Sequence, residues 1–300
     1  MEEGNGWTRY GAAHVGKIEG LWGQAWRAGP ATVFQTFDFA RHWMATFSQA
    51  EVEIWVHTTS SLVLPLARRD GTVSLVGEGL FDYCDLIGPA PYGTDGPVLQ
   101  QAAEIVMAGN ARPRATGVRA DSRFSDFWRR LGEGRYFSAA PQRPADAGAL
   151  GHTRIARRWQ RAEHAGVRAH EETEMRERRA TLDWILERKQ HHPANMLGEL
   201  ERQWIETVVE HSPHLAEVWS LRRGEHIMSG LLCWRCPPTR YCYTIAHEPS
   251  DAALSPGILL LYFVVNRSMS SGWDIDFLTG EQAFKLRFAT RRQPLHRYGF

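Results

Sequence analysis

The chain has 300 residues, a hydrophobic fraction of 43% and a formal net charge of +1 at neutral pH. Its length predicts two domains, because one domain usually takes about 100–200 residues. The balanced charge gives no general indication that nucleic acid or a membrane surface is a partner. The longest apolar run, Ile258 to Val265, is far shorter than the ~20 residues of a membrane-spanning helix. No secretion signal is visible, so we expect a soluble, cytoplasmic protein.

Residues 1–140 have the pattern of one mixed α/β domain. Helical patterning around Lys17 to Ala28 is followed by short alternating strands rich in β-branched residues. The strands are predicted at Val52 to His57, Ser61 to Ala67 and Thr72 to Val76. A compact polar group, Asp82, Tyr83 and Asp85, interrupts the apolar segment that follows. These three residues are candidates for binding a substrate hydroxyl or amine, and a hydrogen-bonded strand end explains them equally well.

The segment from Ala139 to Gly151 is rich in Pro, Ala and Gly, and it predicts a linker between domains at 1–140 and 141–300. A strongly basic helix is predicted next, from Thr153 to Ala165. Its arginines are Arg154, Arg157, Arg158 and Arg161. This face is suited to an anionic ligand, although a solvated helix surface gives the same pattern.

Helices and strands alternate in the rest of the chain, which predicts an α/β fold. A hairpin turn at Pro237-Pro238-Thr239 indicates two antiparallel strands, so we expect a mixed sheet. The helices are predicted at Glu174 to His192 and Glu201 to Glu210, and the strands at Leu215 to Leu221, Met228 to Cys236 and Tyr241 to Ile245.

Three cysteines of this hairpin region, Cys233, Cys236 and Cys242, together with His247 have spacings that suit zinc. Cysteines on a hairpin are more often small buried residues. We therefore expect buried thiols and no metal.

The start of the next predicted helix is a candidate anion site. Ser255 is a favourable N-cap, and Pro256 fits the first helical position. Gly257 leaves the backbone open at this helix N-terminus, where unpaired amides and the dipole favour phosphate. Ser255, Gly257 and Ile258 are therefore the candidate residues for binding a phosphate-bearing cofactor.

A short strand with two carboxylates on one face follows, because Asp274 and Asp276 alternate with apolar residues. Mutual repulsion can raise the pKa of one carboxyl toward a useful value, although hydrogen bonding to the next helix explains Asp276 equally well. Thr279 and Gln282 are spaced for a capping box that opens a last helix carrying Lys285.

This C-terminal stretch resembles the signature of GNAT-type acyltransferases grouped with the cellulose-biosynthesis protein CelD, which are relatives of the FemABX aminoacyl transferases. The matching segments are Ser255-Pro256-Gly257, Asp276-Phe277, Gly280-Glu281 and Phe284-Lys285. Two positions depart: Glu281 replaces an Asp, and Phe284 replaces a Tyr, with loss of its hydroxyl. The resemblance implies two GNAT-like lobes with a FemABX-like architecture.

The resemblance also implies an enzyme that moves an acyl group, such as acetyl, from acyl-CoA to an amine or hydroxyl. The family's association with exopolysaccharide synthesis points to a sugar or polysaccharide precursor as acceptor. In this reaction the acceptor attacks the thioester directly, and backbone donors stabilise the oxyanion. The candidate catalytic residues are Asp276, Glu281, Lys285 and His247.

Two alternatives stay open, because the chain lacks the Gly-rich loop that GNAT enzymes usually place before this helix. A FemABX-like transferase would use aminoacyl-tRNA, whose phosphates would contact Arg154 to Arg161. A non-catalytic GNAT-fold partner of a biosynthetic complex would keep the fold without the chemistry, and Phe284 favours this reading.

Overall fold

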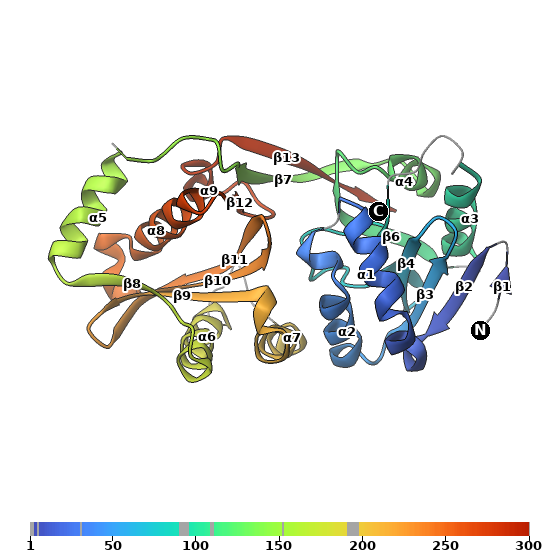
Figure 1. Ribbon diagram of the computed structural model, residues 1–300, viewed down its shortest axis with the longest axis horizontal. Coiled ribbons are helices and arrows are strands. Elements are labelled where there is room, and N and C mark those ends of the chain that lie inside the picture. Colours follow the sequence, from blue (N-terminus) through green and yellow to red (C-terminus); the bar gives the residue numbers. More distant parts are fainter. Residues whose placement is uncertain are drawn as a thin grey trace. The chain divides into compact units, whose positions relative to one another are not determined.

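The computed structural model describes residues 3–4, 6–30, 32–89, 96–108, 111–151, 153–190 and 198–299 (Figure 1). The chain divides into two compact units: unit 1 is Met1–Ala139 with Gln293–Phe300, and unit 2 is Ala140–Arg292. The sequence predicts a single division near residue 140; the last residues group with unit 1 because their strand pairs there. Within the described residues, no helix is long and apolar enough to cross a membrane.

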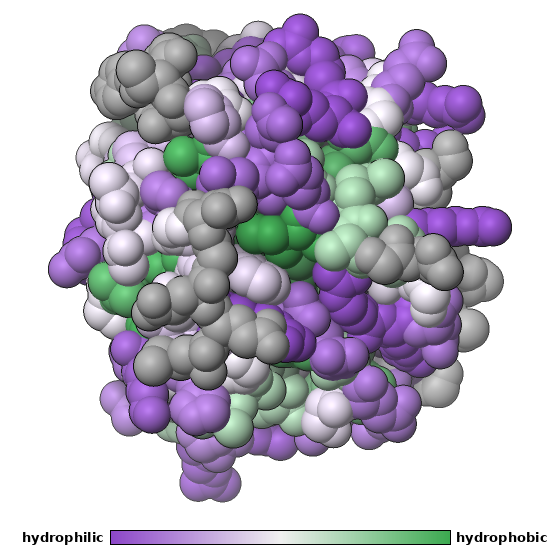
Figure 2. Space-filling model, turned by 90° about the vertical axis from the view of Figure 1, so that its right-hand side faces the viewer, coloured by the Kyte–Doolittle hydropathy of each residue, from purple (hydrophilic) through white to green (hydrophobic). Residues whose placement is uncertain are grey.

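Unit 1 contains a mixed sheet in the order β1-β2-β3-β4-β5-β6-β13, in which only β5 and β6 run parallel. Its strands are β1 (Glu3–Gly4), β2 (Trp7–Gly11), β3 (Glu51–His57), β4 (Leu62–Arg69), β5 (Thr72–Leu75), β6 (Arg112–Arg119) and β13 (Arg291–Tyr298). Its helices are η1 (Ala12–Ile18), α1 (Glu19–Ala28), η2 (Val33–Gln35), α2 (Phe37–Thr46), α3 (Gly96–Met107) and α4 (Ser125–Leu131). Polar side chains cover most of the unit 1 face seen in Figure 2, and apolar ones form small patches.

The parallel pairing of β5 with β6 is short, and the chain itself fills the space beyond it. β5 pairs with β6 only over Thr72–Ser74. The segment after β5 then returns: the Cys84 N–H donates to the Gly117 carbonyl of β6 (3.3 Å), and the Ile87 N–H donates to the Val63 carbonyl of β4 (3.1 Å). Gly117 has φ +71° and a Cβ there would lie 2.3 Å from the Asp82 carbonyl oxygen, so only glycine permits this approach.

Aromatic side chains from this returning segment complete the core of unit 1. The rings of Phe81 and Tyr83 pack against those of Phe34 and Phe39, with centroids 5.7–5.9 Å apart. All four side chains are less than 10% exposed. The segment is therefore held by main-chain bonds on both sides and by apolar packing beneath it.

The sheet of unit 2 has the strand order β7-β12-β11-β10-β9-β8 and is also mixed. Its strands are the last part, from Ala140, of β7 (Arg135–Arg143), and β8 (Val167–Glu171), β9 (Ala216–Arg223), β10 (His226–Cys236), β11 (Thr239–His247) and β12 (Asp274–Asp276). Its helices are α5 (Arg154–His164), α6 (Met175–Gln190), α7 (Glu199–His211), η3 (Pro213–Leu215), η4 (Pro249–Leu254), α8 (Pro256–Ser270) and α9 (Ala283–Leu286). Helices α6 and α7 cover one face of this sheet, and α5 and α8 cover the other (Figure 1).

The predicted mixed α/β class is confirmed, because β11 runs antiparallel to β10 and parallel to β12. The chain between β11 and β12 forms α8, the crossover that a parallel pair requires. Apolar residues of α8, such as Leu260 and Val264, are fully buried against the sheet. The predicted helix end at His191 and His192 lies outside the described residues; α6 is described as far as Gln190.

Candidate active site

The candidate site lies where β11 and β12 part. Their parallel pairing covers only Thr239–Tyr241 of β11, whereas the pairing of β11 with β10 runs on to His247. A cavity of about 1020 Å³ lies along this further part of β11. Its walls are mainly residues 187–189 at the end of α6, 242–249 of β11 and the following turn, 255–258 at the start of α8, and Phe277, Thr279, Gln282, Phe284 and Lys285.

A β-bulge interrupts β11 beside the cavity. Thr244 and Cys242 pair with consecutive residues of β10, so Tyr243 is an additional residue in β11. The side chains of Cys242 and Ile245 both join the core under α8, although three positions separate them. A regular strand would place them on opposite faces. Bulges of this kind re-aim backbone groups and are common beside active sites.

The start of α8 differs from the expected cap. Ser255 occupies the N-cap position in a left-handed conformation (φ 50°), and its side chain makes no capping bond, so the predicted side-chain cap is wrong. Its carbonyl accepts from the Ile258 N–H (3.0 Å), while its Oγ accepts from Arg158 of α5 (3.2 Å). The Arg158 guanidinium also donates to the Leu254 carbonyl (3.0 Å). No described group accepts from the Gly257 N–H. One amide, the helix dipole and a nearby guanidinium therefore meet at this end of the cavity.

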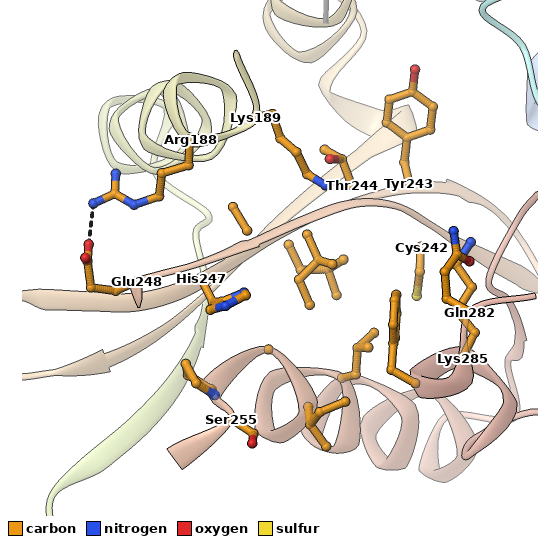
Figure 3. A pocket seen from close by; sticks show the side chains of 18 of the residues that line it. Arg188, Lys189, Cys242, Tyr243, Thr244, His247, Glu248, Ser255, Gln282 and Lys285 are labelled. Atoms are coloured by element: carbon orange, nitrogen blue, oxygen red, sulfur yellow. Dashed lines mark hydrogen bonds and ion pairs between the residues drawn. The ribbon is translucent and has the colours of Figure 1, made fainter. Parts of the chain in front are cut away.

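Lys285 lies at the other end of the cavity. Its ammonium donates to the Thr279 carbonyl (2.7 Å), which fixes the charge beside the wall formed by Gln282 and Cys242 (Figure 3). The predicted capping box of Thr279 and Gln282 is wrong: Gln282 itself is the N-cap of α9, and no side chain caps the helix. His247, in contrast, lies near Ser255 (Figure 3).

The end of α6 supplies charged groups that the sequence analysis did not single out. Arg188 donates to Glu248 at 2.5 Å and lies 3.8 Å over the ring of Trp184. The hydrogen bond from Arg188 lowers the pKa of Glu248. Lys189, half-buried, extends from α6 toward Thr244 (Figure 3). Burial lowers the pKa of its ammonium.

Five of the predicted site residues line this cavity, namely His247, Lys285, Ser255, Gly257 and Ile258. Among the described residues, neither Asp276 nor Glu281 is part of the wall. Asp276 is 4% exposed and accepts from the Gln142 amide (2.7 Å) and from the Leu278 N–H (2.7 Å). Glu281 pairs with Arg292 (3.0 Å). The two hydrogen bonds to Asp276 hold the end of β12 in place, and a catalytic role for either carboxylate stays a prediction.

The candidate substrate-binding residues Asp82, Tyr83 and Asp85 belong to unit 1. Tyr83 is 2% exposed. The Asp85 carboxylate accepts from the Ser122 hydroxyl (2.6 Å) and from the Trp128 indole N–H (2.9 Å). Burial raises the pKa of Asp85 to about 6. These contacts explain Asp85 as an internal bridge, and substrate binding by the three residues stays a prediction.

The cysteines of the hairpin lie inside unit 2. Cys233 and Cys242 face each other across β10 and β11 with sulfurs 3.9 Å apart, and both are buried. Burial raises the pKa of the Cys233 thiol well above its ordinary value. Within the described part of the chain, no group of three or more His, Cys, Asp or Glu residues is placed to hold a metal ion.

Comparison with known proteins bears on the fold of this site. Residues 151–286 match the family described as acetyltransferase (GNAT) domain. Unit 2 carries a GNAT-fold domain. The matched residues include β10, the bulged strand β11 and α8. None of the curated proteins matches the sequence.

Solved structures resemble nearly the whole chain at low sequence identity. FemX is 12% identical, with 95% of this chain and 96% of that one covered and a TM-score of 0.65. The C-terminal domain (DUF2156) of an Agrobacterium fabrum protein described as a lysylphosphatidylglycerol synthetase is 12% identical, with 94% and 91% covered and a TM-score of 0.63. A tandem GNAT protein from the clavulanic acid biosynthesis pathway is 13% identical, with 97% of each chain covered and a TM-score of 0.51. At such identities the likeness shows the fold alone.

Proposed function

We propose that unit 2 transfers an acyl group from an acyl-CoA thioester to an amine or hydroxyl acceptor. The observation that carries this proposal is the cavity along β11 beyond its pairing with β12. An extended chain such as the pantetheine arm of coenzyme A can lie along this strand as a further strand would. Its phosphates then reach the α8 N-terminus, where the Gly257 N–H and Arg158 supply positive potential.

The two ends of the cavity support different parts of this reaction. His247 lies near Ser255, so we place it at the phosphate end (Figure 3). Lys285 is held at the opposite end by the Thr279 carbonyl, near the bulge of β11. An ammonium fixed there, together with backbone N–H groups of the bulged strand, stabilises the oxyanion that forms when the acceptor attacks the thioester.

The acceptor is proposed from the resemblance and from general chemistry. An amine or hydroxyl needs only to reach the thioester carbon, because the transfer is direct and leaves no acyl group on the protein. The CelD-type resemblance supports a sugar or an exopolysaccharide precursor as the molecule that carries this group.

The test is calorimetric titration with acetyl-CoA of the wild type and of Gly257→Glu. A Cβ at Gly257 makes only ordinary contacts, at 3.5 Å from Ile245, so the variant should fold, while its carboxylate repels phosphate. We expect acetyl-CoA binding to weaken at least about tenfold in Gly257→Glu. Gly151→Glu is the matched control, because a Cβ at Gly151 meets open space in the same unit. Equal binding by both variants would contradict the proposed phosphate site.

Catalysis is tested separately through Lys285→Met. Release of coenzyme A with a panel of amines should fall by about 10²–10³-fold in this variant, as when a single oxyanion donor is lost. Binding of acetyl-CoA should persist, because Lys285 lies away from the phosphate end. Wild-type protein that neither binds acetyl-CoA nor transfers acetyl to any acceptor would favour the non-catalytic reading.

A second candidate is a FemABX-like transfer from aminoacyl-tRNA. The basic outer face of α5 favours it, because an RNA backbone presents a row of phosphates to such a face. Arg154, Arg157 and Arg161 are exposed on α5 and suit RNA phosphates. Binding of tRNA that weakens steeply with salt and is lost when these three arginines become Ala would support this candidate over acyl-CoA.

A further inference from the structure

Lys189 reaches the cavity from the sheet face opposite to α8. A Cβ at Gly230 of β10 would lie 2.6 Å from Ile185 Cγ1, so α6 packs directly on the strand at this glycine. Gly230 pairs with Ala246 of β11, and the side chain of Thr244 lies two positions earlier on the same face. Thr244 therefore faces α6, and Figure 3 shows Lys189 extending from that helix toward it.

The charge of Lys189 has no counterpart within the described part of the chain. No hydrogen-bond acceptor or carboxylate there contacts its ammonium, which is half-buried. The nearest cation in sequence, Arg188, is already paired with Glu248 and stacked on Trp184. Burial without a partner disfavours the charged lysine, and the lowered pKa of Lys189 reflects this cost. An anionic ligand beside the ammonium would offset the cost of burying this charge.

We propose that Lys189 and Thr244 bind an anionic group of the acceptor, either a carboxylate or a phosphate, and so select acidic acceptors. The inference rests on the proposed acyl transfer. With the donor phosphates at α8, the face of the sheet covered by α6 is left for the acceptor. A lysine ammonium acts as a point charge and a threonine hydroxyl as a donor, a pair that suits either anion.

Matched pairs of probes test this inference by equilibrium binding. Glucosamine 6-phosphate is compared with glucosamine, and glycine with glycinamide, by calorimetric titration. We expect the anionic member of at least one pair to bind about tenfold or more tightly than its neutral partner. Lys189→Met, which keeps the length of the side chain, should abolish this preference, and Lys189→Arg should retain it. The pair that shows the effect distinguishes phosphate from carboxylate.

Two results would overturn the inference: a wild type without preference for the anion in either pair, or a preference that persists in Lys189→Met. Titration with acetyl-CoA is run on the same three proteins. Retained acetyl-CoA binding together with absent anion preference would remove only this inference. Absent acetyl-CoA binding together with a Lys189-dependent preference would remove the proposed donor and leave the anion site.

Discussion

Each unit contains a short pair of parallel strands, β5–β6 in unit 1 and β11–β12 in unit 2. The two units differ in what occupies the space beyond that pair. In unit 1, β5 pairs with β6 over three residues, and the returning segment around Cys84 then bonds to both β6 and β4. In unit 2, β11 pairs with β12 over three residues, and a cavity of about 1020 Å³ follows. In unit 1 the cavity that the returning segment lines together with Phe34 has a volume of only about 10 Å³.

Two strands that separate leave room for a ligand in unit 2, where no other described segment fills the space between them, but not in unit 1, where the returning segment does. In unit 1 the carboxylate of Asp85 is used in internal hydrogen bonds, which it accepts from Ser122 and Trp128. Unit 2 keeps Lys189 and Lys285 on the cavity wall. One unit thus contributes a packed core, and the other offers a place for ligand.

The largest change in stability should come from truncating Phe81, an aromatic residue of the returning segment in unit 1. Phe81→Ala deletes a ring that packs against Phe34 and Phe39, so we expect the free energy of unfolding to fall by about 3–5 kcal/mol. Urea unfolding measures this change. Acetyl-CoA binding to unit 2 should survive, and Met107→Ala, at a side chain 50% exposed, should leave stability unchanged within about 0.5 kcal/mol. A loss below about 1 kcal/mol for Phe81→Ala would mean that the gap is not closed by packing.

A smaller, pH-dependent change in the free energy of unfolding should come from the buried carboxyl of Asp85. Burial raises its pKa from 3.8 to about 6, so between these values the folded chain holds a proton that the unfolded chain has released. The free energy of unfolding should therefore fall as pH rises from about 4 to 6, by up to about 3 kcal/mol, and then level off. Urea unfolding across this range measures it for the wild type and for Asp85→Asn, which should lack this component.

The control for this titration is Asp70→Asn, because the Asp70 side chain is 86% exposed. Its unfolding should follow the wild-type pH dependence. Were Asp85→Asn also to follow it, Asp85 would not be the buried carboxyl of unit 1, and a ligand-facing role would regain support.

Local patterns in the sequence were enough to predict much of unit 2. Strand alternation and the hairpin turn depend on neighbouring residues, and so does the helix start at Pro256, which the structure places one residue after Ser255. The left-handed backbone of Ser255 was not predictable, because Arg158, far away in the chain, holds its hydroxyl.

Contacts between distant residues decided the rest of the site. Lys189 lies near Thr244 because of the register between β10 and β11 and the one-residue bulge in β11. Neither the register nor the bulge can be recognised from the amino-acid composition. Asp276 turns toward Gln142, which belongs to β7. In unit 1, the polar residues between Asp82 and Asp85 lie on an apolar segment. Such a pattern is equally typical of a cavity wall and of a packed core, so the sequence alone did not distinguish the two.

The smallest predicted effect concerns how each unit holds the turn beyond its parallel pair. In unit 2 a main-chain bond from the Glu248 N–H to the Met228 carbonyl (2.9 Å) is joined by the side chain of Arg158, which donates to the carbonyl of Leu254 and to the hydroxyl of Ser255. Arg158→Ala should therefore weaken acetyl-CoA binding only about fivefold, in line with about 1 kcal/mol for such partly exposed bonds. Calorimetric titration measures it, with the exposed Arg157→Ala of the same helix as control. Unchanged binding would show that the turn before α8 holds its shape without α5, and a loss above about a hundredfold would place Arg158 in direct contact with the donor phosphates.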